Sequence, residues 1–224
     1  MSTRGIRGWG IAAVAVAAVA IAGCGARPTV AAGTAALTSE NRPIANITGL
    51  ELDTSGRVEI TTGATQSLSV EAPADVLPVL TSEVTGGVLR LSVKDHAAIR
   101  NSGSIRYKLT VPTLDRISVE GSGDVRYTDL KAPTLTVDID GSGDVTLAGT
   151  VEKQTVRLSG SGNYSAADLA TRSADVSVDG SGGVDVRVAD TLKIDIKGSG
   201  DVSYRGTPTV DKHVAGSGDI TQAH

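Results

Sequence analysis

Residues 139–164 read IDGSGDVTLAGTVEKQTVRLSGSGNY and contain two copies of one motif, Gly141-Ser-Gly-Asp-Val145 and Gly160-Ser-Gly-Asn-Tyr164. The motif recurs through the second half of the chain, with intervals of 20, 19, 20, 18 and 18 residues between first glycines. Those first glycines are Gly121, Gly141, Gly160, Gly180, Gly198 and Gly216. Two weaker copies, Thr54–Val58 and Asn101–Ile105, precede them. A repeat of nearly constant length predicts a repetitive architecture built from one structural unit per repeat.

Apolar and polar residues alternate on both sides of each motif. The apolar positions two residues before the motif are Val119, Ile139, Leu158, Val178, Ile196 and Val214. Those four residues before it are Ile117, Val137, Val156, Val176 and Ile194, with Lys212 in the last copy. The motif itself ends in Val125, Val145, Tyr164, Val184, Val202 and Ile220. A period of two residues indicates strands with one buried face, so each unit is a strand, a glycine-rich turn and a second strand.

Such short units bury their apolar faces only by stacking on one another. We therefore predict an all-β fold, a parallel β-helix or β-solenoid of 18–20-residue coils with GSG[D/N]V turns. The glycines suit a sharp corner that requires positive φ angles, and a small serine lets successive corners stack. An antiparallel sandwich also has short strands and glycine turns, but it does not require constant spacing or apolar columns in register.

The fourth motif position carries an acid or an amide in most copies, at Asp124, Asp144, Asn163, Asp201 and Asp219. The simpler interpretation is structural, because these side chains accept hydrogen bonds from turn N–H groups. The alternative is a cation site between carboxylates of adjacent coils, either Asp124 with Asp144 or Asp201 with Asp219, since oxygen ligands suit Ca²⁺. The calcium-binding nonapeptide motif of β-rolls places its glycines and aspartates differently.

Three tyrosines, Tyr107, Tyr127 and Tyr204, each lie six residues after the start of a motif copy. The spacing predicts that Tyr107 and Tyr127 are neighbours in one column. They form either an aromatic stack that fills a corner of the coil or a sugar-binding platform.

Composition limits the classes of function. The formal charge of −4 argues against a nucleic-acid binder with a basic face. One cysteine excludes a disulfide framework and a multi-cysteine metal site, and three histidines leave little for a histidine-based centre. No phosphate-binding loop, dinucleotide fingerprint or nucleophile elbow is present. We expect no catalytic residues and no cofactor.

The N-terminus is typical of an export signal. Arg4 and Arg7 precede twelve apolar residues, 11–22, which are too few for a membrane span. The run ends in Ile21-Ala-Gly-Cys24 and resembles the bacterial lipoprotein signal, so we predict cleavage after residue 23 and lipidation of Cys24. Residues 24–43 then form a flexible tether and residues 44–224 the folded domain. An ordinary secretory signal with a chance cysteine and an uncleaved anchor helix are the alternatives.

The GSG[D/N]V repeats and their alternating strands resemble the bacterial head GIN domain family, which is described as an auto-transporter adhesin. The likeness covers residues 44–222 and includes Ile47–Ile60, Gly87–Val93 and Leu109–Pro112. The resemblance implies a β-solenoid in an extracytoplasmic setting. It implies no reaction and no catalytic residues.

The function we predict is a non-enzymatic binding or adhesion module of the cell envelope, held on the outer face of the cell membrane by its lipid. Its partners are an envelope polymer or a surface protein. The alternative is an accessory or stress-sensing protein that docks onto a membrane protein. A polysaccharide-active enzyme is disfavoured because the segments between repeats are short. Asp219 lies five residues before His224, so an open solenoid end there predicts homo-oligomerisation or a covering partner.

Overall fold

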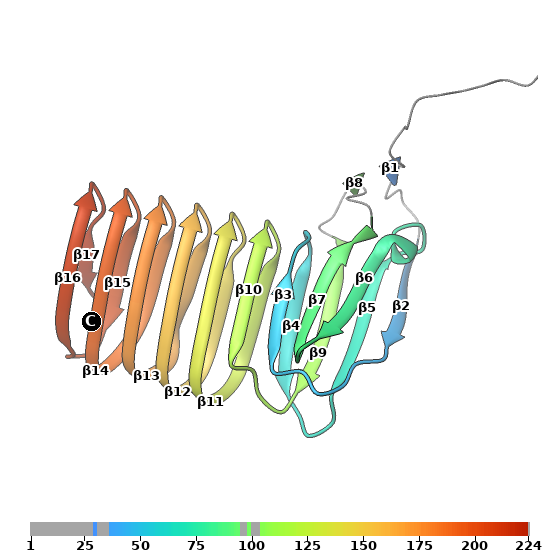
Figure 1. Ribbon diagram of the computed structural model, residues 1–224, viewed down its shortest axis with the longest axis horizontal. Coiled ribbons are helices and arrows are strands. Elements are labelled where there is room, and N and C mark those ends of the chain that lie inside the picture. Colours follow the sequence, from blue (N-terminus) through green and yellow to red (C-terminus); the bar gives the residue numbers. More distant parts are fainter. Residues whose placement is uncertain (1–28, 31–35, 95–97, 100–103, 224) are drawn as a thin grey trace, which may run out of the picture.

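The computed structural model describes residues 29–30, 36–94, 98–99 and 104–223, and these residues form an all-β fold. The predicted parallel solenoid is confirmed: most strands stack side by side along one axis (Figure 1). One short 3₁₀ turn, η1 (Leu77–Val79), is present within the described ranges. None of the described helical segments is long and apolar enough to cross a membrane.

The repeats build the regular part of the solenoid. Its central strands are β11 (Asp124–Gly141), β12 (Val145–Gly160), β13 (Asn163–Gly180) and β14 (Gly183–Gly198). Each runs from one GSG turn through a bend to the next turn, so its two halves lie in different sheets (Figure 1). β10 (Arg116–Gly121) precedes this series, and β15 (Asp201–Arg205), β16 (Thr209–Gly216) and β17 (Ile220–Gln222) follow it.

We call the two sheets the post-turn sheet and the pre-turn sheet. The post-turn sheet contains the strand segments that follow a turn, including the first halves of β11 to β14, then β15 and β17. The pre-turn sheet contains β10, the second halves of β11 to β14, and β16. β16 pairs with β14 and β17 with β15, so both are edge strands within the described residues.

The apolar columns predicted from the repeats exist. Val119, Ile139, Leu158, Val178 and Ile196 are in register across five strands, and each is at most 2% exposed. In the last coil the column continues with Val214, which is 40% exposed because no other strand of the described residues lies beyond β16. Lys212 occupies the inward column next to Ile194 and is exposed. A charged residue at an inward position of an edge strand is a common way to discourage unwanted pairing.

The turns need both of their glycines. Gly141 has a φ of 135°, and a Cβ placed on it would overlap the carbonyl oxygen of Gly121 in the neighbouring coil. A Cβ on Gly143 would overlap the carbonyl oxygen of Gly123 in the same way. The Gly121 carbonyl accepts hydrogen bonds from Ser142 N and Gly143 N at 2.8 and 3.1 Å. The backbone ladder therefore passes through the turn, and the close approach of coils excludes side chains there.

At the N-terminal end the spatial order differs from the chain order. β3 (Gly49–Leu52) and β4 (Arg57–Thr62) lie beside β10 and β11, so the Thr54–Val58 copy adjoins the first full motif. β7 (Val88–Val93) and β9 (Arg106–Val111) form the next layer outward. The Asn101–Ile105 copy, although nearest in sequence, is thus not the neighbour of Gly121, and residues 101–103 lie outside the described part.

Antiparallel strands close this end. β5 (Ser67–Pro73) pairs with β9, and β6 (Leu80–Thr85) pairs with β7. β2 (Leu37–Arg42) pairs with β5, and its Arg42 donates to the carbonyls of Leu80 and Leu77 at 2.7 and 3.0 Å. Residues 37–42 were predicted to belong to the tether, but they are part of the fold. β1 (Thr29–Val30) and β8 (Ala98–Ile99) form a separate small sheet.

Candidate functional site

The predicted lipidation site, Cys24, lies outside the described residues, as does the predicted signal segment 1–23. Their roles stay predictions. The other candidate site residues lie on the solenoid, and their surroundings are described below.

The acidic column of the motifs forms a ladder along the turns. Asp144 Oδ1 accepts hydrogen bonds from the backbone N and from Nδ2 of Asn163, at 3.0 and 2.9 Å. Asn163 Oδ1 in turn accepts from Gly183 N at 3.2 Å, and Asp201 Oδ1 accepts from Asp219 N at 2.9 Å. Each of these side chains therefore satisfies an N–H group at the start of the next coil, as the structural interpretation requires.

The two carboxylate pairs proposed for a cation do lie in adjacent coils. Asp124 also forms an ion pair with Arg57 at 3.4 Å, which partly neutralises its carboxylate. Within the described ranges no three or more His, Cys, Asp or Glu side chains are grouped so as to hold a metal ion. The cation prediction for Asp124 with Asp144 and for Asp201 with Asp219 thus has no third protein ligand to support it.

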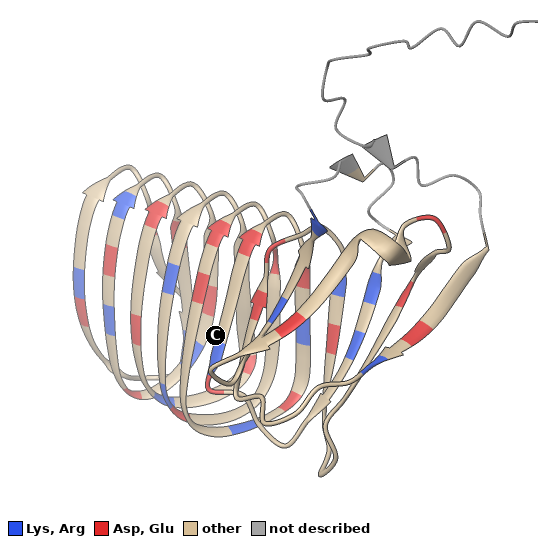
Figure 2. Cartoon of the chain, turned by 45° about the vertical axis from the view of Figure 1, so that its right-hand side comes forward, with Lys and Arg blue, Asp and Glu red and all other residues tan. Residues whose placement is uncertain are grey.

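The tips of the turns form a continuous ridge, which we call the GSG ridge. Its exposed serines, one per coil, are Ser122, Ser142, Ser161, Ser181, Ser199 and Ser217. Acidic residues flank them on many coils, before the turn at Glu120, Asp140 and Asp179 and after it in the ladder described above. Figure 2 shows these acidic segments near the turn ends of the strands. Because neighbouring strands lie about 4.8 Å apart, the ridge repeats the serine hydroxyl at that spacing. The carboxylates recur less regularly, since Ser159 and Asn163 flank one turn and Lys197 precedes another.

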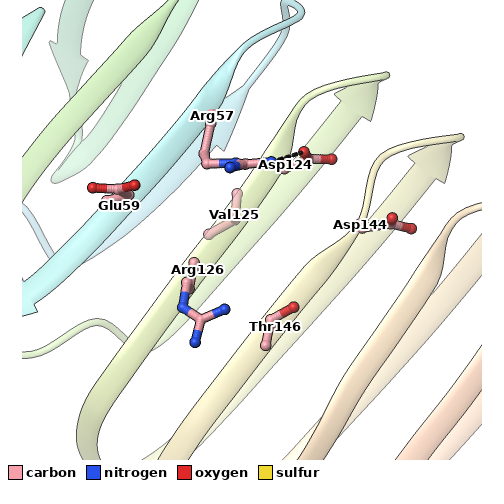
Figure 3. Close-up of a pocket in the computed structure, with 7 residues that line it drawn as sticks. All are labelled: Arg57, Glu59, Asp124, Val125, Arg126, Asp144 and Thr146. Carbon is pink, nitrogen blue, oxygen red and sulfur yellow. Dashed lines mark hydrogen bonds and ion pairs between the residues drawn. The ribbon is translucent and has the colours of Figure 1, made fainter. Parts of the chain in front are cut away.

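A hollow of about 430 Å³ opens on the outer surface of the post-turn sheet (Figure 3). Its lining comes from three adjacent strands and one turn. Arg57 and Glu59 lie on β4, Asp124, Val125 and Arg126 on β11, Thr146 on β12, and Asp144 in the turn before β12. Figure 3 shows the Arg57 guanidinium directed at Asp124. The Arg126 side chain points away from Glu59 and lies beside Thr146. Arg126 forms no ion pair or side-chain hydrogen bond within the described part of the chain.

The tyrosines do not form the predicted column. Tyr107 is in register with Val58, and Tyr127 is in register with Ile60, so β4 separates them and offsets them by two residues. Both side chains are fully buried, which also contradicts a sugar-binding platform made of this pair. The prediction failed because it assumed that chain order and spatial order agree at the N-terminal end.

A buried polar network was not predicted from the sequence. Tyr164 takes the position that is valine or isoleucine in the other motifs, and its hydroxyl donates to Gln154 Oε1 at 2.7 Å. Gln154 Nε2 donates to Thr171 Oγ1 at 3.0 Å, and Gln154 is fully buried. The sequence did hold a signal for this network, namely a tyrosine at an inward-facing position of the motif. A buried tyrosine hydroxyl needs a hydrogen-bond partner, so a polar residue was to be expected nearby.

Burial also shifts the acidity of the tyrosines. It raises the pKa of Tyr164 and of Tyr107 well above the usual value, because the phenolate would lose its hydration. Burial raises the pKa of Tyr127 as well, with a smaller opposing effect from its 3.0 Å hydrogen bond to Thr62. At neutral pH these three phenols are therefore uncharged.

Comparison with known proteins gives one family and several structures. A family model described as "Putative auto-transporter adhesin, head GIN domain" matches residues 46–208. A "putative adhesin" from Bacteroides fragilis is 21% identical with a TM-score of 0.73, and the alignment covers 87% of this chain and 100% of that chain.

Two further structures are similar. A "putative lipid binding protein" from Parabacteroides distasonis is 21% identical with a TM-score of 0.53, covering 88% of this chain and 100% of that one. A "putative adhesin" from Parabacteroides merdae is 16% identical with a TM-score of 0.51, covering 88% and 99%. At these identities the likeness shows a shared fold alone. No curated protein matches the chain.

Proposed function

The chain belongs to the head GIN domain family, and we propose that it is a binding and adhesion module of the bacterial cell envelope. The family and the first of the similar structures are described as adhesins rather than as enzymes. In this proposal the GSG ridge engages a linear envelope polymer. Cys24 carries the lipid that holds the protein on the outer side of the membrane.

The observation that supports this proposal is the regularity of the ridge. Equivalent serine hydroxyls recur at the strand spacing of about 4.8 Å over successive coils, and carboxylates flank them on most coils. A linear polymer with repeating hydroxyl groups meets such a ridge with many weak, equivalent contacts. Several weak contacts made together give a much higher avidity than any one of them.

Binding is tested with the chain from residue 25 onward, which lacks the predicted signal and the lipidated cysteine. Titration against purified peptidoglycan, envelope polysaccharides and matrix proteins is expected to give saturable binding to one of them. Ser161→Arg changes one exposed ridge position and should weaken that binding. Thr134→Arg, at an exposed position on the opposite bend, is the matched control and should leave it unchanged. Absence of binding to every polymer tested argues instead for the accessory role at a membrane protein.

The lipid anchor is tested separately in cells. Labelling with a radioactive fatty acid should mark the wild-type protein and not the Cys24→Ser variant. If both proteins are labelled equally, or neither is, the anchor proposal is wrong, whatever the binding experiment shows.

A further inference from the structure

The outer surface of the post-turn sheet carries two regular rows of side chains. From the N-terminal end, the first row is Arg106, Arg57, Asp124, Asp144, Asn163, Gly183, Asp201 and Asp219. The second row is Lys108, Glu59, Arg126, Thr146, Ser165, Asp185, Ser203 and Thr221. These rows lie on eight strands in the order β9, β4, β11, β12, β13, β14, β15 and β17.

Charge is unevenly distributed along the two rows. The four cations, Arg106, Lys108, Arg57 and Arg126, all lie on β9, β4 and β11. β5 pairs with β9 on its other side, and its Glu71 forms an ion pair with Lys108 at 3.7 Å. The half of the surface from β13 onward carries Asp185, Asp201 and Asp219 and no cation in these rows. The half from β9 to β12 also carries three acids, Glu59, Asp124 and Asp144, so its net charge in these rows is +1 against −3 in the other half. We call these two halves the basic half and the acidic half.

We propose that this surface binds a second copy of the chain, related by a two-fold axis that runs parallel to the strands between β12 and β13. Such an axis places each strand of the basic half opposite a strand of the acidic half of the other copy. β9 then faces β17, β4 faces β15, β11 faces β14, and β12 faces β13. An interface of this kind is self-complementary, because every contact occurs twice.

The residues brought together match in charge. In the first row, Arg106 faces Asp219 and Arg57 faces Asp201 of the other copy. In the second row, Arg126 faces Asp185. No pair of like charges is created in either row.

The departures from the repeat consensus fit the same axis. Asp124 would face an acid if the motif at β14 had its usual aspartate, but that position is Gly183. Asp144 would likewise face an acid, but the position at β13 is Asn163. Beyond the two rows, the exposed Arg187 and Arg205 come opposite Thr128 and Thr61, which are neutral. The exceptions to the motif therefore remove the like-charge contacts that a uniform repeat would produce.

Two side chains on this surface lack partners in the single copy. The Arg126 guanidinium, in the hollow of Figure 3, forms no ion pair within the described residues. Asp185 Oδ1 is buried with no hydrogen-bond partner among the described residues. The proposed axis places Asp185 of one copy over the hollow that contains Arg126 of the other.

The size of the surface predicts a weak complex. Eight strands about 4.8 Å apart and segments of about five residues give a face of about 34 by 15 Å, so the pair buries about 1,000 Å² in total. That area is at the lower limit for a specific interface, and the contacts are mostly between charges. We therefore expect a dimer that forms at low ionic strength and dissociates in salt. The axis also leaves both GSG ridges on the same side of the dimer.

The test is sedimentation of the chain from residue 25 onward, at about 100 μM and at low and high salt. We expect a dimer whose dissociation constant rises by about tenfold or more in Arg126→Glu and in Asp185→Arg, because each change creates two like-charge contacts. A 1:1 mixture of these two variants should again dimerise, since both contacts in the mixed pair then join opposite charges. Lys193→Glu, on the pre-turn sheet, is the control and should dimerise as the wild type does.

A complex with a dissociation constant of about 1–10 μM is well populated at 100 μM. A protein that stays monomeric at this concentration and at low salt would therefore overturn the proposal. So would a dimer that the two charge reversals leave unchanged, or one that their mixture does not restore, because the interface then lies elsewhere. Circular dichroism of each variant shows whether it is folded. The proposal does not depend on polymer binding, and the two experiments can fail independently.

Discussion

Comparing Gly160→Ala with Gly121→Ala tests how much the close contact between neighbouring coils at the GSG turns contributes to stability. Gly160 has a φ of 119°, and a Cβ there would overlap the carbonyl oxygen of Gly141. Gly121 has a similar φ of 112°, but a Cβ there would meet no atom within 4 Å. The two substitutions share the backbone strain of an alanine at positive φ and differ in the steric overlap with the neighbouring coil.

The strain costs about 1–3 kcal/mol at either position. The overlap adds about 1–3 kcal/mol at Gly160 alone, as for other overpacked sites. Gly121→Ala should therefore lower the free energy of unfolding by about 1–3 kcal/mol and Gly160→Ala by about 2–6 kcal/mol. Urea unfolding followed by circular dichroism measures both, with the m-value as a check that the same structure unfolds. Equal destabilisation of the two variants would refute the reasoning, because the coil-to-coil contact would then contribute nothing.

Three further results are expected. Tyr164→Phe leaves Gln154 Oε1 buried without its donor and should lower the free energy of unfolding in urea by about 1–3 kcal/mol. Tyr204→Phe should be near neutral, because the Tyr204 hydroxyl makes no hydrogen bond within the described residues. Arg42→Ala removes the donor to two carbonyls at the closed end, so hydrogen exchange in η1 should become faster, and unchanged exchange would count against a clamping role. The pKa values of the three buried tyrosines are raised above about 10, the pKa of tyrosine in the unfolded chain. The free energy of unfolding should therefore be unaffected by these groups below pH about 10 and should fall above it, because the unfolded chain ionises first. A pH series of urea midpoints that stays flat into that alkaline range would contradict this assignment.

The repetitive part of the fold was predictable because its sequence is repetitive. The spacing of Gly121, Gly141 and Gly160 determines the coil length, and the alternation around them determines which side chains are inward. The register of the structure then follows from stacking identical units, since a one-residue slip would expose every apolar column.

The N-terminal end was not predictable in the same way. Thr54–Val58 and Asn101–Ile105 are both weak copies, and local pattern does not say which one adjoins Gly121. The answer depends on long-range pairing of β3 and β4 with β10 and β11. β2 was missed for a related reason, because its residues Leu37–Arg42 are mostly exposed and carry no period-two signal.

The candidate sites were predicted unevenly. The acid ladder was expected from the fourth motif position, and hydrogen bonds from backbone N–H groups bear out the structural interpretation at Asp144, Asn163 and Asp201. At Asp124 the carboxylate pairs with Arg57 instead. The hollow at Arg126 combines side chains from β4, β11 and β12, and the position of β4 depends on tertiary pairing. A surface made of residues far apart in the chain therefore could not be read from the repeats alone.

The measurement that tests the central claim most directly is binding as a function of polymer length. Oligomers of the envelope polymer that binds would be prepared with increasing numbers of units and titrated against the chain from residue 25 onward. A ridge of stacked coils predicts an affinity that rises with each added unit and levels off once the oligomer spans the ridge. An affinity that is independent of length beyond one or two units would contradict the account, because a single local pocket would then be responsible.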